Sequence, residues 1–170
     1  MDIAPDLVTA QLTKEVASVR VAPDPPSDFE TFWRTVRVEL ARWPANVELT
    51  PDDAPRHGQE GLRRFIWRAN SLGGRRIAGP VIFPAAGGAK PAPIWVYSHG
   101  YGSVNSGAAW RPDLARLGFV ALGLDARGYH RSRRPGDPGV PGWATHGIER
   151  RESYILRGAV ADLLRAVEVA

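Results

Sequence analysis

The chain runs through Ala92-Pro-Ile-Trp-Val-Tyr-Ser-His-Gly-Tyr-Gly-Ser103, an apolar segment that ends abruptly in a short loop with two glycines. The run Ile94 to Tyr97 is continuous and rich in β-branched and aromatic residues, which predicts a strand buried on both faces. Strands of this kind carry functional groups at their carboxyl ends. There, Gly100 and Gly102 let backbone N–H groups turn toward a ligand. The loop after this strand is therefore the first candidate site.

The neighbouring segments predict the rest of the sheet. Upstream, two extended runs at Leu62–Ala69 and Arg75–Phe83 flank paired glycines, which predicts a β-hairpin with an apolar face at Ile77, Val81 and Ile82. Downstream, a short helix over Trp110–Leu117 has Pro112 in its first turn and stops at Gly118. A second buried strand follows at Phe119–Leu124, completing a βαβ unit. We expect an α/β fold with a mixed, mostly parallel sheet flanked by helices.

Two longer helices are expected outside this sheet. The first begins at a capping box, Ser27 to Glu30, ends at Trp43-Pro44, and should bury an apolar stripe made of Phe29, Phe32, Trp33, Val36 and Leu40. The second spans Tyr154 to Val169 and should turn one face to the core, made of Leu156, Val160, Leu163, Leu164 and Val167. Residues 1–24 read as a polar N-terminal arm, and residues 25–170 as a single domain, here a partial one.

Composition excludes several classes of protein. The 170 residues are 44% hydrophobic and 24% charged and contain no cysteine, which excludes disulfides and thiol chemistry. The sequence shows no signal peptide and no apolar run long enough for a membrane span, so we expect a cytoplasmic protein with no membrane partner. The net charge is +4, but the arginines are dispersed except for Arg131, Arg133 and Arg134. We interpret these three arginines as solvent-exposed surface residues and expect no nucleic-acid partner.

Several motifs, taken in order, resemble the acetyl xylan esterase and cephalosporin C deacetylase family of α/β-hydrolases. They are His-Gly-Tyr-Gly after one strand, Asp-x-Arg-Gly after the next, Gly147-Ile148, Ser153-Tyr154, and Asp162-x-x-Arg-Ala-Val-Glu168, together with Asp28-Phe-Glu-Thr-Phe-Trp33 upstream. The likeness covers about residues 21–170. It implies a serine carboxylic-ester hydrolase that removes acetyl groups from sugars, xylo-oligosaccharides or cephalosporin-type esters, and that forms homo-oligomers when complete.

The resemblance implies that the backbone N–H of Tyr101 is one of two oxyanion-hole donors, each typically worth about 2.7–4 kcal/mol of barrier. From the residues alone, the loop also fits an ordinary turn between a strand and a helix. His99 lies beside this donor, whereas the catalytic histidine of α/β-hydrolases follows the nucleophile and the acid, so we expect His99 to be structural. Gly100 and Gly102 shape the loop.

Asp125 and Arg127 look like a catalytic pair, but we expect them to form an ion pair that holds two loops together at the top of the sheet. His130 and His146 are lone histidines in a basic loop and receive no ligand role. The sequence also departs from the family pattern: Ser103 replaces a second glycine, Tyr129-His130 replaces Gln-Gly, and the aromatic run becomes Tyr154-Ile-Leu156. These departures affect the expected shape of the acyl pocket.

No serine of this chain lies in a Gly-x-Ser-x-Gly context, and a triad acid and base would follow such a nucleophile. We therefore expect the N-terminal part of an α/β-hydrolase fold, truncated before the nucleophile strand and inactive alone. In the hydrolase strand order that strand pairs with Ile94–Ser98, so this strand should be an unpaired, aggregation-prone edge. Serine ester hydrolysis needs no metal or organic cofactor.

Two alternatives remain open on the sequence. The chain is either a non-catalytic remnant that serves as a binding or assembly module, or part of another α/β-hydrolase, such as a dienelactone hydrolase or a peptidase-like esterase. In the enzymatic interpretations the partner is a small ester substrate.

Overall fold

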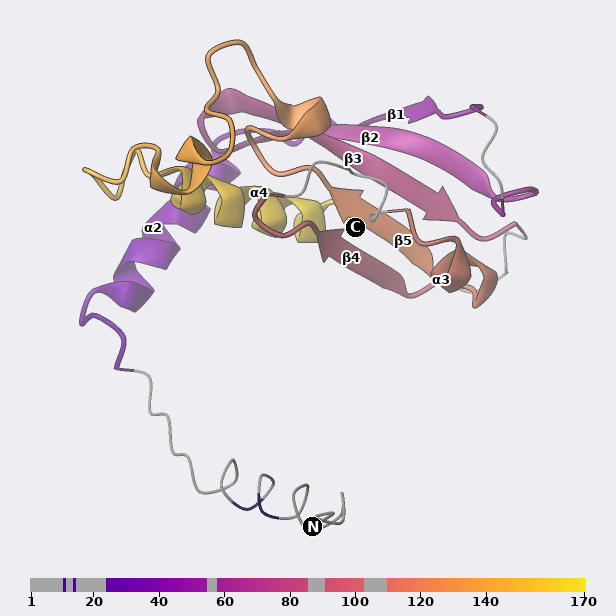
Figure 1. The fold of residues 1–170 in the computed structure, drawn as a ribbon, viewed down its shortest axis with the longest axis horizontal. Coiled ribbons are helices and arrows are strands. Elements are labelled where there is room, and N and C mark those ends of the chain that lie inside the picture. The colour runs from indigo at the N-terminus through magenta and orange to yellow at the C-terminus, as the bar shows by residue number, and fades with distance from the viewer. Residues whose placement is uncertain (1–10, 12–13, 15–23, 55–57, 86–90, 103–109) are drawn as a thin grey trace, which may run out of the picture. The chain divides into compact units, whose positions relative to one another are not determined.

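A five-stranded sheet organises the fold (Figure 1). The computed structural model describes residues 11, 14, 24–54, 58–85, 91–102 and 110–170. The chain divides into two units, Met1–Trp33 and Arg34–Ala170, and the sheet belongs to the second. The loop prediction for Ser103 and the residues after it lies outside the described residues.

The strands are β1 (Glu48–Pro51), β2 (Arg63–Ser71), β3 (Arg75–Phe83), β4 (Ile94–Ser98) and β5 (Val120–Leu124), arranged in the order β1-β2-β3-β5-β4. A mixed sheet is confirmed, but the expectation that it is mostly parallel is wrong for this chain. Only β4 and β5 run parallel, whereas the other three pairings are antiparallel. Two of these pairings have a local reason, because β1, β2 and β3 follow one another without the long crossover that parallel neighbours need. The third joins β3 to β5, which are not consecutive in the chain.

The predicted hairpin is confirmed, with β2 and β3 paired from Arg63–Phe83 to Ser71–Arg75. Its turn is a short 3₁₀ segment, Leu72–Gly74, in which Gly73 and Gly74 have φ of 73° and 66°. A different glycine, Gly79 in β3, allows a close approach of β5. A Cβ at position 79 would lie 1.9 Å from the carbonyl oxygen of Gly123. That oxygen accepts a hydrogen bond of 2.7 Å from the indole Nε1 of Trp67.

Helices cover both faces of the sheet. On one face, α4 (Ile155–Glu168) contributes Ala166 to a core that also contains Trp67, Ala69, Ile77, Val81, Val120, Leu122 and Leu124. On the other face, the short helix α3 (Pro112–Arg116) packs Ala115 against Ile82 and Trp110. As predicted, α3 stops at Gly118, whose φ is +89° and whose N–H donates to the carbonyl of Ala115.

The first long helix is α2 (Phe29–Ala41), which confirms the predicted segment. Its burial differs from the prediction, because Val36 and Leu40 are buried whereas Phe29 is 43% exposed. The buried residues belong to the part of the helix that lies within the second unit. There, the guanidinium of Arg165 on α4 donates to the carbonyls of Leu40 (2.8 Å) and Trp43 (2.7 Å) and so holds the end of α2.

α4 forms where the sequence predicts it, but it buries the opposite face. The predicted core positions Leu156, Val160, Leu163 and Val167 are all exposed, and Val167 is 58% exposed. The buried face consists of Ile155, Gly158, Ala161, Asp162, Arg165 and Ala166. Burial of Asp162 and Arg165 is possible because each has charged or carbonyl partners within the fold, and a pattern of apolar residues does not record such partners.

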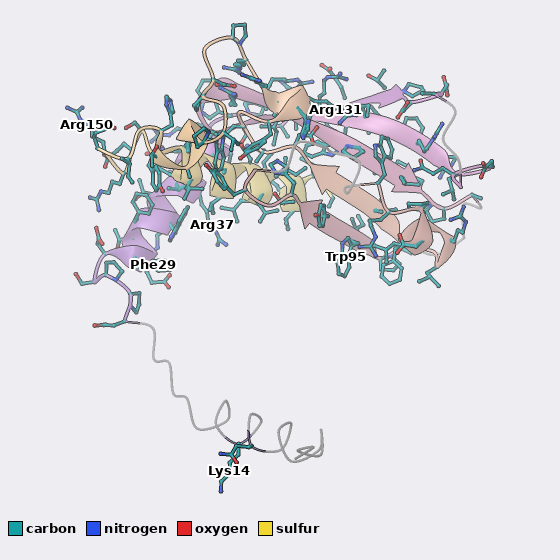
Figure 2. The ribbon with its side chains drawn as sticks, in the orientation of Figure 1. Lys14, Phe29, Arg37, Trp95, Arg131 and Arg150 are labelled. Atoms are coloured by element: carbon teal, nitrogen blue, oxygen red, sulfur yellow. The ribbon has the colours of Figure 1, made fainter. Side chains whose placement is uncertain are left out.

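β4 lies at the edge of the sheet and pairs only with β5, as expected from the sequence. Its first two side chains, Ile94 and Trp95, are 39% and 45% exposed, and Trp95 projects outward from the strand (Figure 2). The prediction of a strand buried on both faces is therefore wrong: the first two residues of β4 are exposed and the other three are half-buried. No helix in the described part of the chain is long and apolar enough to cross a membrane.

Candidate active site

Two loops meet at one end of the strands, because β4 and β5 are parallel neighbours whose carboxyl ends lie side by side. The first loop is His99–Gly102 and follows β4. The second begins at Asp125 and continues to Trp143 through a 3₁₀ turn at His130–Ser132. Gly102 has a φ of +75°, a conformation that favours glycine. The candidate site consists of these two loops.

His99 ties the first loop to the second. Its Nε2 accepts a hydrogen bond from the Ala126 N–H (3.2 Å), and its Nδ1 lies 3.0 Å from the Gly100 carbonyl oxygen. Both contacts are satisfied together when the ring is neutral with its proton on Nδ1. The ring also lies 4.3 Å from that of Tyr129, centroid to centroid. Both ring nitrogens are thus used within the loops, which agrees with a structural role for His99.

Tyr129 of the second loop supports the first loop. Its hydroxyl accepts a hydrogen bond from the Gly102 N–H (3.3 Å), and its ring packs 5.0 Å from Trp143 in an edge-on arrangement. Trp143 is held by a hydrogen bond from its Nε1 to the Arg127 carbonyl (2.8 Å). The indole lies so close to Gly128 that a Cβ there would be 2.6 Å from Nε1. The Tyr129 side chain therefore fixes the position of Gly102.

Tyr101 is an exposed residue of the loop, at 56%. Among the described residues, none accepts a hydrogen bond from its backbone N–H. Its phenol points away toward the second loop, where the hydroxyl donates to the Pro141 carbonyl at 2.6 Å. An oxyanion hole uses backbone N–H groups of this kind as donors.

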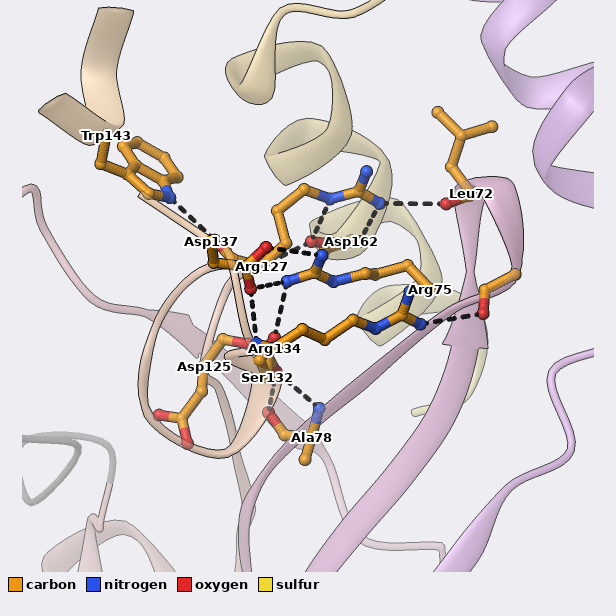
Figure 3. Close-up of polar contacts among 11 residues, drawn as sticks. Leu72, Arg75, Ala78, Asp125, Arg127, Ser132, Arg134, Asp137, Trp143 and Asp162 are labelled. Atoms are coloured by element: carbon orange, nitrogen blue, oxygen red, sulfur yellow. Dashed lines mark hydrogen bonds and ion pairs between the residues drawn. The ribbon is translucent and has the colours of Figure 1, made fainter. Parts of the chain in front are cut away.

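Asp125 and Arg127 do not pair with each other, so the expected ion pair is wrong. Asp125 is fully buried, and its Oδ2 lies 3.0 Å from Nη1 of Arg131. Arg127 instead binds Asp162 of α4 through two side-chain bonds, Nη2 to Oδ1 at 2.7 Å and Nε to Oδ2 at 2.9 Å (Figure 3). Both residues still support the loops.

A network of hydrogen bonds and an ion pair holds the middle of the long loop (Figure 3). Arg75, at the start of β3, forms an ion pair with Asp137 and donates to the Ser132 carbonyl at 3.0 Å. Ser132 is buried, and its Oγ accepts from the Ala78 N–H at 2.9 Å. Burial raises the pKa of Asp137, but the hydrogen bonds from Arg75 and from the Arg134 N–H outweigh it, so the pKa lies below its ordinary value.

Sequence reasoning did not assign roles to Ser132, Asp137 or Arg75. Ser132 lies between two arginines in a segment rich in glycine, proline and arginine, where a solvent-exposed side chain is the ordinary expectation. One available signal was the Asp137-Pro-Gly turn sequence, because an aspartate at such a position bonds nearby backbone N–H groups. Asp137 does so with the Arg134 N–H at 2.6 Å.

A cavity of about 640 Å³ opens beside these loops, lined mainly by residues 128–143 of the second loop. Tyr129 and Trp143 form an aromatic part of its wall, and His130 and Arg133 provide its basic side chains. His130 has a φ of +37°, unusual for a residue other than glycine. The other lone histidine, His146, lines a separate and smaller cavity of about 170 Å³ near Arg127 and Arg157.

The mixed sheet, the helices on both faces and the glycine-containing loop at the carboxyl end of β4 place the molecule in the α/β-hydrolase class of folds. The family model of acetyl xylan esterase (AXE1) matches residues 7–170. The chain belongs to the acetyl xylan esterase family.

Two solved structures support this assignment. The acetyl xylan esterase from Paenibacillus sp. R4 superposes with a TM-score of 0.70 at 25% identity, over 88% of this chain and 48% of that one. Acetyl xylan esterase 1 from Thermoanaerobacterium sp. JW/SL YS485 gives a TM-score of 0.72 at 21% identity, over 87% and 47%. The second likeness concerns the fold alone. The chain thus spans about half the length of each of these esterases.

Proposed function

We propose that this chain is the half of a serine acetyl-ester hydrolase that provides an oxyanion-hole donor, and that it needs a second polypeptide segment to supply the nucleophile. The observation that carries the proposal is the backbone N–H of Tyr101, which bonds no acceptor among the described residues and lies in a loop held by His99 and Tyr129. Acetylated sugars or xylo-oligosaccharides are the proposed substrates, with cephalosporin-type acetyl esters as a further possibility within the same chemistry.

The catalytic role of the loop is electrostatic. Attack on an acetyl carbonyl moves negative charge onto its oxygen, and an N–H fixed beforehand stabilises that charge without reorganising. His99 and Tyr129 act as positioning residues, because their side chains bond the backbone N–H groups of Ala126 and Gly102. The proton transfers belong to a serine, a histidine and an acid that this chain does not contain in the required pattern.

Two surfaces support the requirement for a second segment. β4 has an open edge, and a strand carrying the nucleophile would pair there. The exposed apolar stripe on α4, formed by Leu156, Val160, Leu163 and Val167, lies on the helix that packs over β5 and β4. The relatives above contain about twice the aligned length, which is enough chain to cover both surfaces.

The decisive experiment compares the chain alone with the chain co-expressed with the polypeptide encoded immediately downstream of it, using p-nitrophenyl acetate. We expect no serine-dependent turnover from the chain alone and turnover from the pair. In the pair, Tyr101→Pro, which removes the N–H, should lower kcat about 10²–10³-fold. Tyr101→Phe keeps the N–H and should retain most of the rate.

Turnover by the chain alone that a serine-directed inhibitor abolishes would contradict the proposed incompleteness. If no downstream segment restores hydrolysis, the non-catalytic binding or assembly module becomes the better interpretation, since an open edge strand suits partner binding equally well. A panel of acetyl sugars, dienelactones and peptide esters on the active pair separates the acetyl esterase from the other α/β-hydrolase activities.

A further inference from the structure

The cavity beside the candidate loop has a chemical character that the acetyl group does not explain. Its volume of about 640 Å³ lies in the range of sites that hold drug-sized ligands, whereas an acetyl group has only three heavy atoms. The cavity therefore has room for the alcohol part of an ester.

Its position fits that use. Tyr129, in the cavity wall, accepts the hydrogen bond from the Gly102 N–H, and Trp143, also in the wall, lies 6.3 Å from the ring of Tyr101. The Tyr101 hydroxyl is bonded to Pro141, within the same segment of the second loop. A molecule in the cavity would thus lie close to the side chain of Tyr101, the residue that we propose as oxyanion-hole donor.

The charged side chain among the described residues that line the cavity is basic. Of the three clustered arginines, Arg131 is paired with Asp125 at 3.0 Å, and Arg134 donates to the Gly74 carbonyl at 3.2 Å. Arg133 lines the cavity, is exposed, and forms no ion pair with any described residue. None of the described residues that line the cavity is acidic.

His130 adds a second polar group. His130 lines the cavity with part of its surface, whereas its Nε2 is buried and has no hydrogen-bond partner among the described residues. The backbone of His130 has a φ of +37°, a conformation that residues other than glycine rarely adopt. His130 and Arg133 line the same cavity.

We propose that this cavity is the subsite for the alcohol part of the ester and that it selects a ring bearing an anionic group, a carboxylated sugar in particular. The planar guanidinium of Arg133 matches a carboxylate with two parallel hydrogen bonds. Tyr129 and Trp143 line the cavity, where each exposes a small part of its surface, 7% and 6%. The assignment of the cavity to the alcohol part of an ester rests on the proposed function. Binding of an anionic ring does not, because it requires no catalysis.

The test is equilibrium binding followed through the indole N–H signal of Trp143, with methyl glucuronide, methyl glucoside and glucose 6-phosphate as probes. The chain carries Trp95→Lys on the open edge of β4 to limit association, and Trp95 does not line the cavity. We expect methyl glucuronide to bind at least about tenfold more tightly than the neutral glucoside, as a charged bidentate contact requires. Tighter binding of the phosphate would overturn the preference for a carboxylate.

Arg133→Gln should remove the preference, so that both sugars bind equally. Arg134→Gln is the matched control, because it removes the same charge from the same loop and its guanidinium is directed at Gly74. Equal binding of the two sugars by the parent chain, no binding of any probe, or equal effects of the two substitutions would each overturn the proposal. If the active pair hydrolyses esters without preferring anionic ones, this inference is refuted and the proposed function is not. If the chain binds the anionic sugar but no pair hydrolyses esters, the proposed function is refuted and the binding site is not.

Discussion

The guanidinium of Arg127 occupies the space over α4 that Gly158 leaves open: a Cβ at position 158 would lie 2.2 Å from Nη1. From there Arg127 reaches Asp162, one turn further along the helix. Helix propensity alone predicts that alanine at position 158 would stabilise α4 by about 1 kcal/mol. The contact with Arg127 reverses that expectation.

We therefore predict that Gly158→Ala lowers the free energy of unfolding by about 1–3 kcal/mol, the usual cost of inserting atoms into a packed contact. Denaturant unfolding followed by circular dichroism measures the change. Gly142→Ala is the matched control, because a Cβ at position 142 meets no atom within 4 Å. A stabilised Gly158→Ala variant would show that Arg127 moves aside at no cost.

Asp162 has no exposed surface, and its carboxylate accepts three hydrogen bonds from Arg127, including one from the backbone N–H at 3.0 Å. Breaking a buried ion pair from one side leaves the other charge uncompensated, at a typical cost of about 3–5 kcal/mol. Asp162→Ala should be destabilised by that amount. Glu152→Ala, which removes an exposed pair with Arg151, should leave the unfolding midpoint unchanged. Equal midpoints for both variants would contradict the importance of burial.

These residues also mark where sequence reasoning succeeds and fails. The hairpin, α3 with its glycine stop, β5 and the extent of both long helices follow from local patterns, and the open edge at β4 follows from the strand order of the fold. The orientation of α4 does not follow from local patterns. The apolar periodicity predicts that Leu156 and Val160 are buried and that the charged residues Asp162 and Arg165 are exposed. Their burial depends on Arg127 and on the carbonyls at the end of α2, which are distant in sequence. Such partners become visible only in three dimensions.

The candidate site shows the same division. The glycine-containing loop at the end of a strand is readable from residues 94–102 alone. The pairing of Asp125 with Arg131 instead of Arg127 was missed, because it depends on the 3₁₀ turn at His130–Ser132 that brings Arg131 back toward the sheet. Likewise, the Arg75–Asp137 contact joins residues from β3 and from the middle of the long loop, and no local pattern connects them.

The Arg75–Asp137 pair predicts an acid dependence. The pKa of Asp137 is lower in the folded protein than the value of about 3.9 expected in an unfolded chain. Its contribution to stability is therefore complete above about pH 4 and is lost as the pH falls through the lower, folded pKa. Asp137→Asn should be less stable than the parent near neutral pH, and the difference should shrink in acid. Unfolding curves measured at several pH values test this, and a difference that does not depend on pH would contradict it.

The last prediction concerns association through the open edge of the sheet. Trp95 on β4 and Leu163 on α4 are exposed, at 45% and 38%, and β4 is an edge strand whose unpaired groups can join another chain. Burying one large apolar side chain is worth about 1.5–3 kcal/mol, so Trp95→Lys and Leu163→Lys should each weaken self-association about tenfold or more. Sedimentation velocity over a range of concentrations measures the effect. Ile148→Lys adds the same charge at an exposed apolar loop position and should leave association unchanged. If the parent chain sediments as a monomer at every concentration and melts cooperatively, the edge of β4 is not a site of association.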